Sequence, residues 1–266
     1  MSGYLHSQSF FNQIKGARLN GLANQAVTVK GSESWAINPS ALGFEPQWSF
    51  SVNGESRFTG TGIRGSSISG SLPINKNSGL AIGGEFYGLP EYHQRSFGLG
   101  YGRLISNKLS IGSSFQYLQF FNTLNENRPL TLLTLGTLYV LSDQLSLGAS
   151  FHLPFTSSGI EGYYAAPSFQ IGSSYAVSDL VKIYTELDKM NDFGWNIKIA
   201  FEYQVINAFV LRIGVSTSPQ LFSTGISLKL SPRIRVDIAS LFYQRIGLTP
   251  SLSLVYTFES KKNKQE

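Results

Sequence analysis

Three residues in the middle of the chain are of the kinds that could carry out hydrolysis. Ser150, His152 and Glu161 would supply a nucleophile, a base and an acid. This chemistry requires the three side chains to converge within hydrogen-bonding reach, and nothing in the sequence shows that they do. Because serine is common throughout the chain, chance proximity is the better interpretation, and we expect a protein that is not an enzyme.

A second stretch, residues 60–65, matches the G-x-G-x-x-G pattern of dinucleotide-binding sites. Such a site needs a helix directly after the glycines, because the N-terminus of the helix holds the pyrophosphate. A strand-like segment follows here, so we interpret the glycines as a hairpin loop. The chain also has no Cys, which excludes disulfides and thiolate metal sites. We expect neither a cofactor nor a metal.

Charged residues recur at positions that we expect to face inward in strand-like segments. They are Glu85, Arg103, Lys182, Glu186, Asp188, Lys198, Glu202, Arg212, Lys229, Arg235 and Asp237. A selective ion pore would favour one sign of charge, whereas both signs occur here. We therefore predict a structural network of internal ion pairs and hydrogen bonds.

The remaining basic residues are scattered, apart from the tail Lys261, Lys262 and Lys264. A nucleic-acid-binding protein would concentrate its basic residues on one face. We therefore expect no nucleic-acid partner.

The elements that must position these residues have an alternating pattern. In residues 145–151, for example, Leu, Leu, Ala and Phe alternate with Ser, Gly and Ser. Successive side chains of a strand point to opposite faces, so this pattern predicts strands with one apolar and one small polar face. About fourteen such strands fit the sequence, an even number as bacterial outer-membrane barrels require. We place them near 47–58, 62–74, 79–88, 94–105, 108–121, 130–141, 144–155, 165–177, 180–188, 194–206, 208–216, 221–231, 233–244 and 249–259. In the second, Ile63 and Ile68 fall on opposite faces, which predicts a bulge.

The composition favours a membrane protein over a soluble one. Only 14% of the 266 residues are charged, against about a quarter in ordinary soluble domains. No run reaches the roughly 18 to 20 apolar residues that a membrane helix needs. A soluble sandwich or propeller would explain the alternation, but not a polar face of Ser and Gly with so few Lys and Glu. We therefore predict an all-β fold, a transmembrane antiparallel β-barrel in outer-membrane lipid, with its leader peptide removed.

Short polar breaks and longer breaks alternate along the chain, which predicts the orientation of the barrel. With both termini in the periplasm, the short breaks lie on the periplasmic side of the membrane and the longer ones lie on the outer side. A Tyr precedes several short breaks (Tyr139, Tyr175 and Tyr203) and predicts an inner aromatic girdle. The outer girdle would include Phe120, Phe121, Trp195, Phe242 and Tyr243.

The first 46 residues do not alternate. A barrel of about fourteen strands is too wide for its wall side chains alone to fill. We therefore predict a lumen plug over residues 1–46, a β-barrel over 47–260 and a basic periplasmic tail over 261–266.

The stretch GARLNGLANQAVTVKGSESWAINPSALG, residues 16–43, resembles the N-terminal signature of FadL-like outer-membrane barrels, especially the PorV/PorQ branch of Bacteroidetes-type bacteria. The positions that carry the resemblance are Ala17, Arg18, Gly21, Ala23, Trp35, Asn38, Pro39, Ala41 and Leu42. The resemblance implies a fourteen-stranded barrel with its N-terminal segment inside.

The same resemblance implies two alternative functions. PorV-like proteins are companions in type IX protein export, whereas FadL-type transporters take up hydrophobic molecules and capture them with long outer loops. The predicted outer loops are short here, with about nine residues in the longest, close to ordinary connection lengths. We therefore expect an accessory or scaffold subunit of an export or assembly complex, whose partner is a larger outer-membrane barrel or export component. The alternative is a passive transporter of small hydrophobic molecules.

Overall fold

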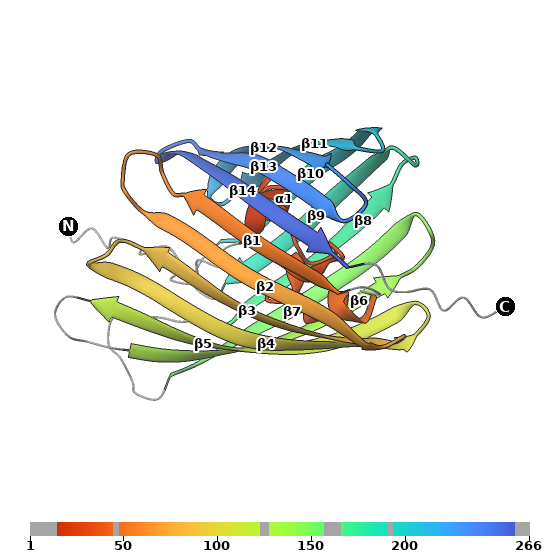
Figure 1. Cartoon of the computed structure of the whole chain (residues 1–266), viewed down its shortest axis with the longest axis horizontal. Coiled ribbons are helices and arrows are strands. Elements are labelled where there is room, and N and C mark those ends of the chain that lie inside the picture. The colour runs from red at the N-terminus through yellow and green to blue at the C-terminus, as the bar shows by residue number, and fades with distance from the viewer. Residues whose placement is uncertain (1–14, 45–47, 123–127, 157–165, 191–193, 259–266) are drawn as a thin grey trace.

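The computed structural model describes residues 15–44, 48–122, 128–156, 166–190 and 194–258 (Figure 1). Fourteen antiparallel strands follow one another around a closed barrel, and β14 pairs with β1 to complete it. The strands are β1 (Ser49–Ser56), β2 (Arg64–Asn75), β3 (Ser78–Gly88), β4 (Tyr92–Ser106), β5 (Leu109–Asn122), β6 (Arg128–Val140), β7 (Leu145–Thr156), β8 (Ser168–Ala176), β9 (Val181–Met190), β10 (Asn196–Ile206), β11 (Phe209–Thr217), β12 (Gln220–Lys229), β13 (Ile234–Tyr243) and β14 (Gly247–Thr257).

The predicted fold class is confirmed, since the number of strands and their antiparallel order are as expected. The second strand does have a register shift, but it does not lie between Ile63 and Ile68, the residues that predict the bulge. Ile63 lies in the connection before β2, so it is not bound by the strand's alternation. The register of β2 against β3 shifts at the other end, between Pro73 and Asn75. The glycine-rich stretch 60–65 runs from this connection into β2, as the hairpin interpretation requires.

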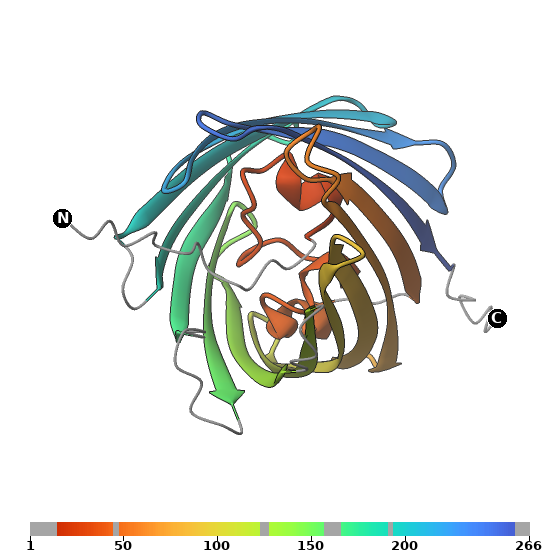
Figure 2. The same ribbon diagram turned by 90° about the vertical axis from the view of Figure 1, so that its left-hand side faces the viewer.

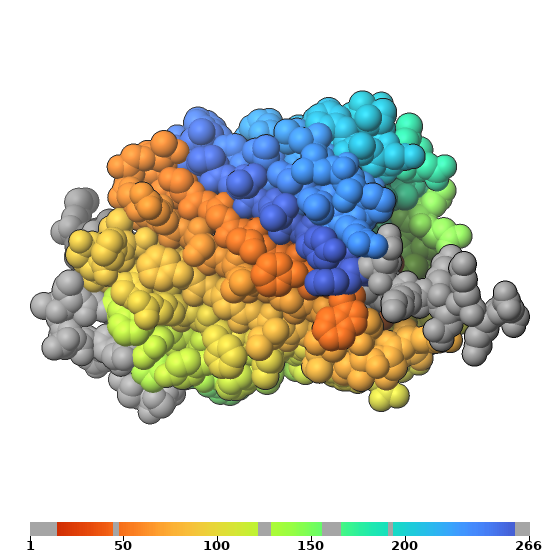
Figure 3. All heavy atoms as spheres, in the orientation of Figure 1, coloured from red at the N-terminus to blue at the C-terminus, as the bar shows by residue number. Residues whose placement is uncertain are grey.

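The two faces of the wall have opposite chemistry. In β4, Phe97, Leu99 and Tyr101 are exposed on the outside, whereas Gln94 and Ser96 are buried inside. A soluble protein would reverse this arrangement, but a bilayer favours it, because the strands satisfy their backbone groups within the closed sheet. Figure 3 shows a continuous surface over β1 to β4 and β12 to β14. The barrel is a bacterial outer-membrane protein.

Residues 15–44, which we call the internal segment, lie inside the ring of strands (Figure 2). They contain three short helical turns, α1 (Gly16–Asn20), η1 (Ser32–Ser34) and η2 (Pro39–Phe44). No helix in the described part of the chain is long and apolar enough to cross a membrane. The ends of the predicted plug, 1–14 and 45–46, and the predicted tail lie outside the described residues, so those domain boundaries stay predictions.

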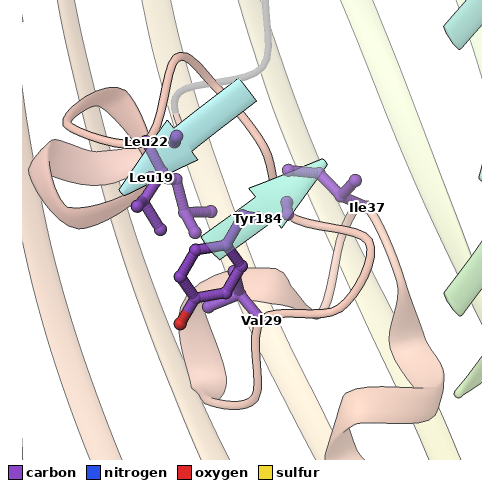
Figure 4. Packing of buried hydrophobic residues seen from close by; sticks show 7 residues of the cluster. Leu19, Leu22, Val29, Ile37 and Tyr184 are labelled. Carbon is purple, nitrogen blue, oxygen red and sulfur yellow. The ribbon is translucent and has the colours of Figure 1, made fainter. Parts of the chain in front are cut away.

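The internal segment has a small apolar core of its own. Leu19, Leu22, Val29 and Ile37 are almost completely buried and form one cluster with Tyr184 of β9 (Figure 4). Burial of each such side chain contributes about 1.5 to 3 kcal/mol. The segment is therefore folded around a hydrophobic centre and attached to the wall through it.

Candidate functional site

On one side of the lumen the internal segment rests on a row of glycines. Gly79, Gly102, Gly112 and Gly136 are successive cross-strand partners on β3, β4, β5 and β6. A Cβ atom added to Gly112 would lie 2.5 Å from the carbonyl carbon of Pro39. Only glycine permits the backbone of η2 to come this close to the wall.

Further inward-facing glycines on β7 and β8, and at other positions of β3 and β4, extend this glycine-lined side. Gly148 of β7 and Gly172 of β8 are cross-strand partners, and Val27 lies against both. The indole of Trp35 lies against a further group of inward-facing glycines, and Cβ atoms added to them would lie 2.6 to 3.1 Å from its ring carbons. These glycines are Gly83, Gly98 and Gly100. Trp35 is therefore seated against bare backbone.

Asn38 ties the internal segment both to itself and to the wall. Its Nδ2 donates to the carbonyl oxygens of Val27 (2.6 Å) and Thr137 (3.0 Å). Its Oδ1 accepts hydrogen bonds from the N–H and the hydroxyl of Ser40. Ser110 of β5 adds a hydroxyl donor to the carbonyl of Ser40 at 2.7 Å. The Asn-Pro pair thus fixes η2 above the glycine row.

On the opposite side, α1 and the turn after it are held by wall hydroxyls. The backbone N–H of Ala17 donates to Ser253 Oγ at 2.7 Å, and that of Ala23 donates to Ser223 Oγ at 3.0 Å. Gly21 allows a close approach to Gly225, because a Cβ atom on Gly21 would lie 3.1 Å from the Gly225 Cα. Small residues on both partners bring the two backbones together.

Six alternating charges connect the internal segment to the wall on this side. Arg18 and Glu33 come from the segment, and the others come from β10, β11 and β13. In order along the network they are Arg18, Glu33, Arg235, Asp237, Arg212 and Glu202. The distance from Arg212 Nε to Glu202 Oε2 is 2.6 Å, and that from Arg235 Nε to Asp237 Oδ2 is 2.8 Å. Three positive and three negative charges balance.

A second charged cluster lies on β9 and β10. Lys198 Nζ is 2.8 Å from Glu186 Oε1 and 3.5 Å from Asp188 Oδ2. The other oxygen of Glu186 accepts the backbone N–H groups of Ala26 and Val27 at 3.0 and 3.1 Å. This buried carboxylate therefore binds a wall lysine and the internal segment at once.

Burial alone would raise the pKa of Glu33, but the positive charges of Arg235 and Arg18 outweigh it and hold the pKa below its ordinary value. The carboxyl group consequently stays ionised. Buried charges are stable only when paired, and removing one partner leaves the other uncompensated. The network is therefore as much a constraint on the position of the internal segment as a source of stability.

The structure brings together most of the charged residues that we predicted to face the lumen. The prediction for Arg103 is wrong. Arg103 shares the outward face of β4 with Leu99 and Tyr101 and is exposed, because Gly102 occupies the inward position facing Pro39. Near the end of a strand its guanidinium can reach the polar edge of the bilayer. Glu85 lines a small cavity between the internal segment and β1 to β3.

Lys182 and Lys229 lie at inward-facing positions but are exposed at the ends of their strands. They sit opposite Glu202 and Arg235 in the strand register. Glu33 is not among the predicted charges, because it lies in the non-alternating front of the chain, where no pattern shows which side chains meet the wall.

The candidate catalytic group is only partly assembled. Ser150 Oγ lies 3.4 Å from His152 Nε2, but the other ring nitrogen is 3.0 Å from the hydroxyl of Thr134. Glu161 lies outside the described residues, and among the described ones no carboxylate hydrogen-bonds His152. All three of Ser150, His152 and Thr134 are buried in the wall of the lumen. They form a polar contact within the barrel interior.

Two aromatic residues predicted for the outer girdle face the lumen instead. Phe120 packs against three buried leucines on β5 and β6, namely Leu118, Leu130 and Leu132. Tyr243 is also buried, in a cluster with Leu221 and Leu241. The first group forms an apolar patch on the inward side of the wall, toward the ends of β5 and β6 that the longer connections join.

The overall architecture is similar to that of several solved channels. The CymD monoaromatic hydrocarbon channel has a TM-score of 0.71 and 13% identity, aligned over 92% of this chain and 98% of that one. The toluene transporter TbuX of Ralstonia pickettii has a TM-score of 0.69 and 10% identity over the same shares. A Pseudomonas aeruginosa FadL homologue has a TM-score of 0.63 and 11% identity, again over 92% and 98%.

The chain has the FadL-type barrel fold. No protein-family model matches the sequence, and no curated protein does so. The similar structures are channels and transporters rather than enzymes. Membership of the PorV/PorQ branch stays a prediction.

Proposed function

We propose that this barrel is a passive outer-membrane channel for small apolar molecules. The observation that carries the proposal is the inward-facing apolar patch of Leu118, Phe120, Leu130 and Leu132 on β5 and β6, in a lumen whose wall carries many Ser, Gln and Gly residues and several ion pairs. The three leucines are themselves almost completely buried. An apolar solute that reached them would leave water and gain about 25 cal/mol for each Å² of its own surface that is buried. The fold similarity to hydrocarbon channels supports the same substrate class.

The internal segment would act as the gate of such a channel. It lies across the lumen, so a solute that leaves the apolar patch meets either the segment or the wall. The ion pairs on β9 to β13 oppose movement of the segment on one side. The glycine row on β3 to β6 offers no side chains to interlock with it on the other. A displacement away from the glycine row would open a path there, and it would break the hydrogen bonds that join Asn38 and Ser40 to β6 and β5.

Uptake of radiolabelled toluene by Gram-negative cells would test the proposal, comparing cells that carry the barrel in their outer membrane with cells that lack it. We expect faster uptake with the wild-type barrel and a clear loss with Leu132→Asn, which makes the patch polar. Leu135→Ala is the matched control, because Leu135 lies on the lipid-facing side of the same strand. Equal uptake with and without the barrel would contradict the proposal.

A second candidate function is the export companion, supported by the occupied lumen and by the short described outer connections. In this role the barrel binds a larger outer-membrane barrel or another component of a type IX-like export complex. Affinity purification from native outer membranes, followed by mass spectrometry, distinguishes the two functions. A stoichiometric export component would favour the companion, whereas a barrel that purifies alone with apolar ligand would favour the channel.

A further inference from the structure

The connection between β1 and β2, residues 57–63, folds over the mouth of the barrel. The backbone N–H of Phe58 donates to Thr249 Oγ1 at 3.1 Å, and the N–H of Thr59 donates to the carbonyl of Leu248 at 2.7 Å. Both acceptors belong to β14. These two bonds place the Phe58 side chain at the rim of the lumen.

The Phe58 ring fills an apolar cage. It packs against a cluster of buried residues, and its ring centroid is 5.2 Å from that of Tyr243 in an edge-to-face arrangement at 74°. The other members of the cluster are Leu221, Leu241 and Ala23, of which Leu241 and Ala23 are fully buried. Because Ala23 belongs to the internal segment, the floor of the cage is the segment itself.

The backbone of Phe58 is held in a disfavoured conformation. Its φ is +48°, which a bulky residue adopts only when the surrounding structure compensates for the cost. Gly60 (φ +97°) and Gly62 (φ +79°) follow closely and give the connection freedom to change shape. The contacts that hold Phe58 in this conformation are those of its ring, its backbone N–H and its carbonyl oxygen, which accepts the N–H of Thr61 at 3.1 Å.

The cage also carries a cation that favours an aromatic occupant. The Arg57 guanidinium lies 5.6 Å from the centre of the Phe58 ring, 6.0 Å from that of Tyr243 and 5.5 Å from that of Tyr87. An ion pair with Glu55 at 2.9 Å holds it in place. A guanidinium within about 6 Å of a ring face attracts the ring's negative charge density, which an aliphatic molecule of the same size lacks.

From these contacts we infer that the cage is a binding site for a single aromatic ring, which Phe58 occupies when no ligand is bound. The inference rests on the proposed channel function and adds a site and a preference to it. An entering ring displaces Phe58, makes the same contacts with Tyr243, Leu241 and Arg57, and lifts the connection through Gly60 and Gly62. The ligand then lies directly on Ala23 of the internal segment.

The inference can be tested with the full-length barrel in detergent, using the water-soluble probe 4-fluorobenzyl alcohol and fluorine NMR. Phe58→Ala empties the cage, and a vacated apolar cavity of this kind binds benzene-sized molecules. If the wild-type cage is open in roughly a tenth of molecules, the variant binds the probe about tenfold more tightly. Phe222→Ala is the matched control, because Phe222 adjoins Leu221 in sequence but faces the lipid.

Two further measurements sharpen the test. Leu241→Asn added to Phe58→Ala should abolish the gain, and cyclohexylmethanol should compete with the probe several-fold less well than benzyl alcohol. Unchanged or weaker binding by Phe58→Ala, relative to wild type and Phe222→Ala, would overturn the inference. Toluene uptake by cells separates the two proposals. If the barrel speeds toluene uptake but Phe58→Ala does not bind the probe more tightly, the ring site is rejected and the channel function stands. If Phe58→Ala binds the probe more tightly but the barrel does not speed uptake, the channel function is rejected and the ring site stands.

Discussion

The two sides of the lumen hold the same internal segment by opposite means. On β3 to β8 the inward positions that face the segment are glycines, which let the backbones of Val27 and Pro39 lie close to the backbone of the wall. On β9 to β13 the wall supplies charged side chains that pair with Glu33 and with the N–H groups of residues 26 and 27. The first side is sensitive to added atoms, and the second is sensitive to removed ones.

The charged side should give the largest effect. Arg212→Ala leaves Glu202 without its ion-pair partner and leaves Asp237 with Arg235 alone, and the loss of one partner of a buried pair typically costs about 3 to 5 kcal/mol. Urea unfolding of the barrel in lipid vesicles, followed by tryptophan fluorescence, measures it. Arg103→Ala is the matched control, because this exposed arginine faces outward. A loss below about 1 kcal/mol is expected there, and equal losses for the two variants would refute the assignment of faces.

The glycine-lined side should respond to a larger side chain. Gly112→Val drives a methyl-bearing carbon into the Pro39 backbone and is expected to cost about 1 to 3 kcal/mol. The same urea titration applies. Gly54→Val provides the comparison, since a Cβ atom there meets nothing within 4 Å. If both valine variants unfold alike, close approach does not explain the glycine row.

The Asn38 amide links the segment to the glycine-lined side by polar contacts. Asn38→Ala leaves the carbonyls of Val27 and Thr137 without this donor, and we expect a loss of about 1 to 2 kcal/mol. Hydrogen exchange of residues 38–44 should become faster while that of residues 17–23 stays the same. Faster exchange in both would show that the two sides are not independent.

Acid should loosen only the charged side. The folded-state pKa of Glu33 is below its ordinary value of 4.5, so its contribution to stability is present above that value and is lost as pH falls through the folded pKa. Glu33→Gln should therefore flatten the acid side of the stability profile. The glycine-lined contacts have no such dependence, so the protection factors of residues 38–44, which are corrected for the intrinsic pH dependence of amide exchange, should not change over the same pH range.

The alternation along each strand was enough to predict the barrel and most of its inward charges, because the bilayer enforces a two-residue period. The two-residue period no longer has to hold at the strand ends, which lie outside the hydrocarbon layer. Arg103, Phe120 and Tyr243 lie near such ends, and for this reason the pattern predicts the wrong face for them. The glycine row spans four strands, so it becomes visible only once the strand register is known. The contacts of Glu33 depend on how an irregular segment folds, and no local pattern encodes that.

The amide of Asn20 has a consequence for how the barrel is made. Its Nδ2 donates to Glu55 Oε2 on β1 at 3.3 Å and to Ser251 Oγ on β14 at 3.0 Å, so one side chain touches both strands of the closing seam. A residue of the internal segment, which precedes the first strand in the chain, therefore binds both the first strand and the last. We expect the barrel to close around α1 rather than before α1 is in position, so that the internal segment helps to align β1 with β14 as well as filling the finished barrel.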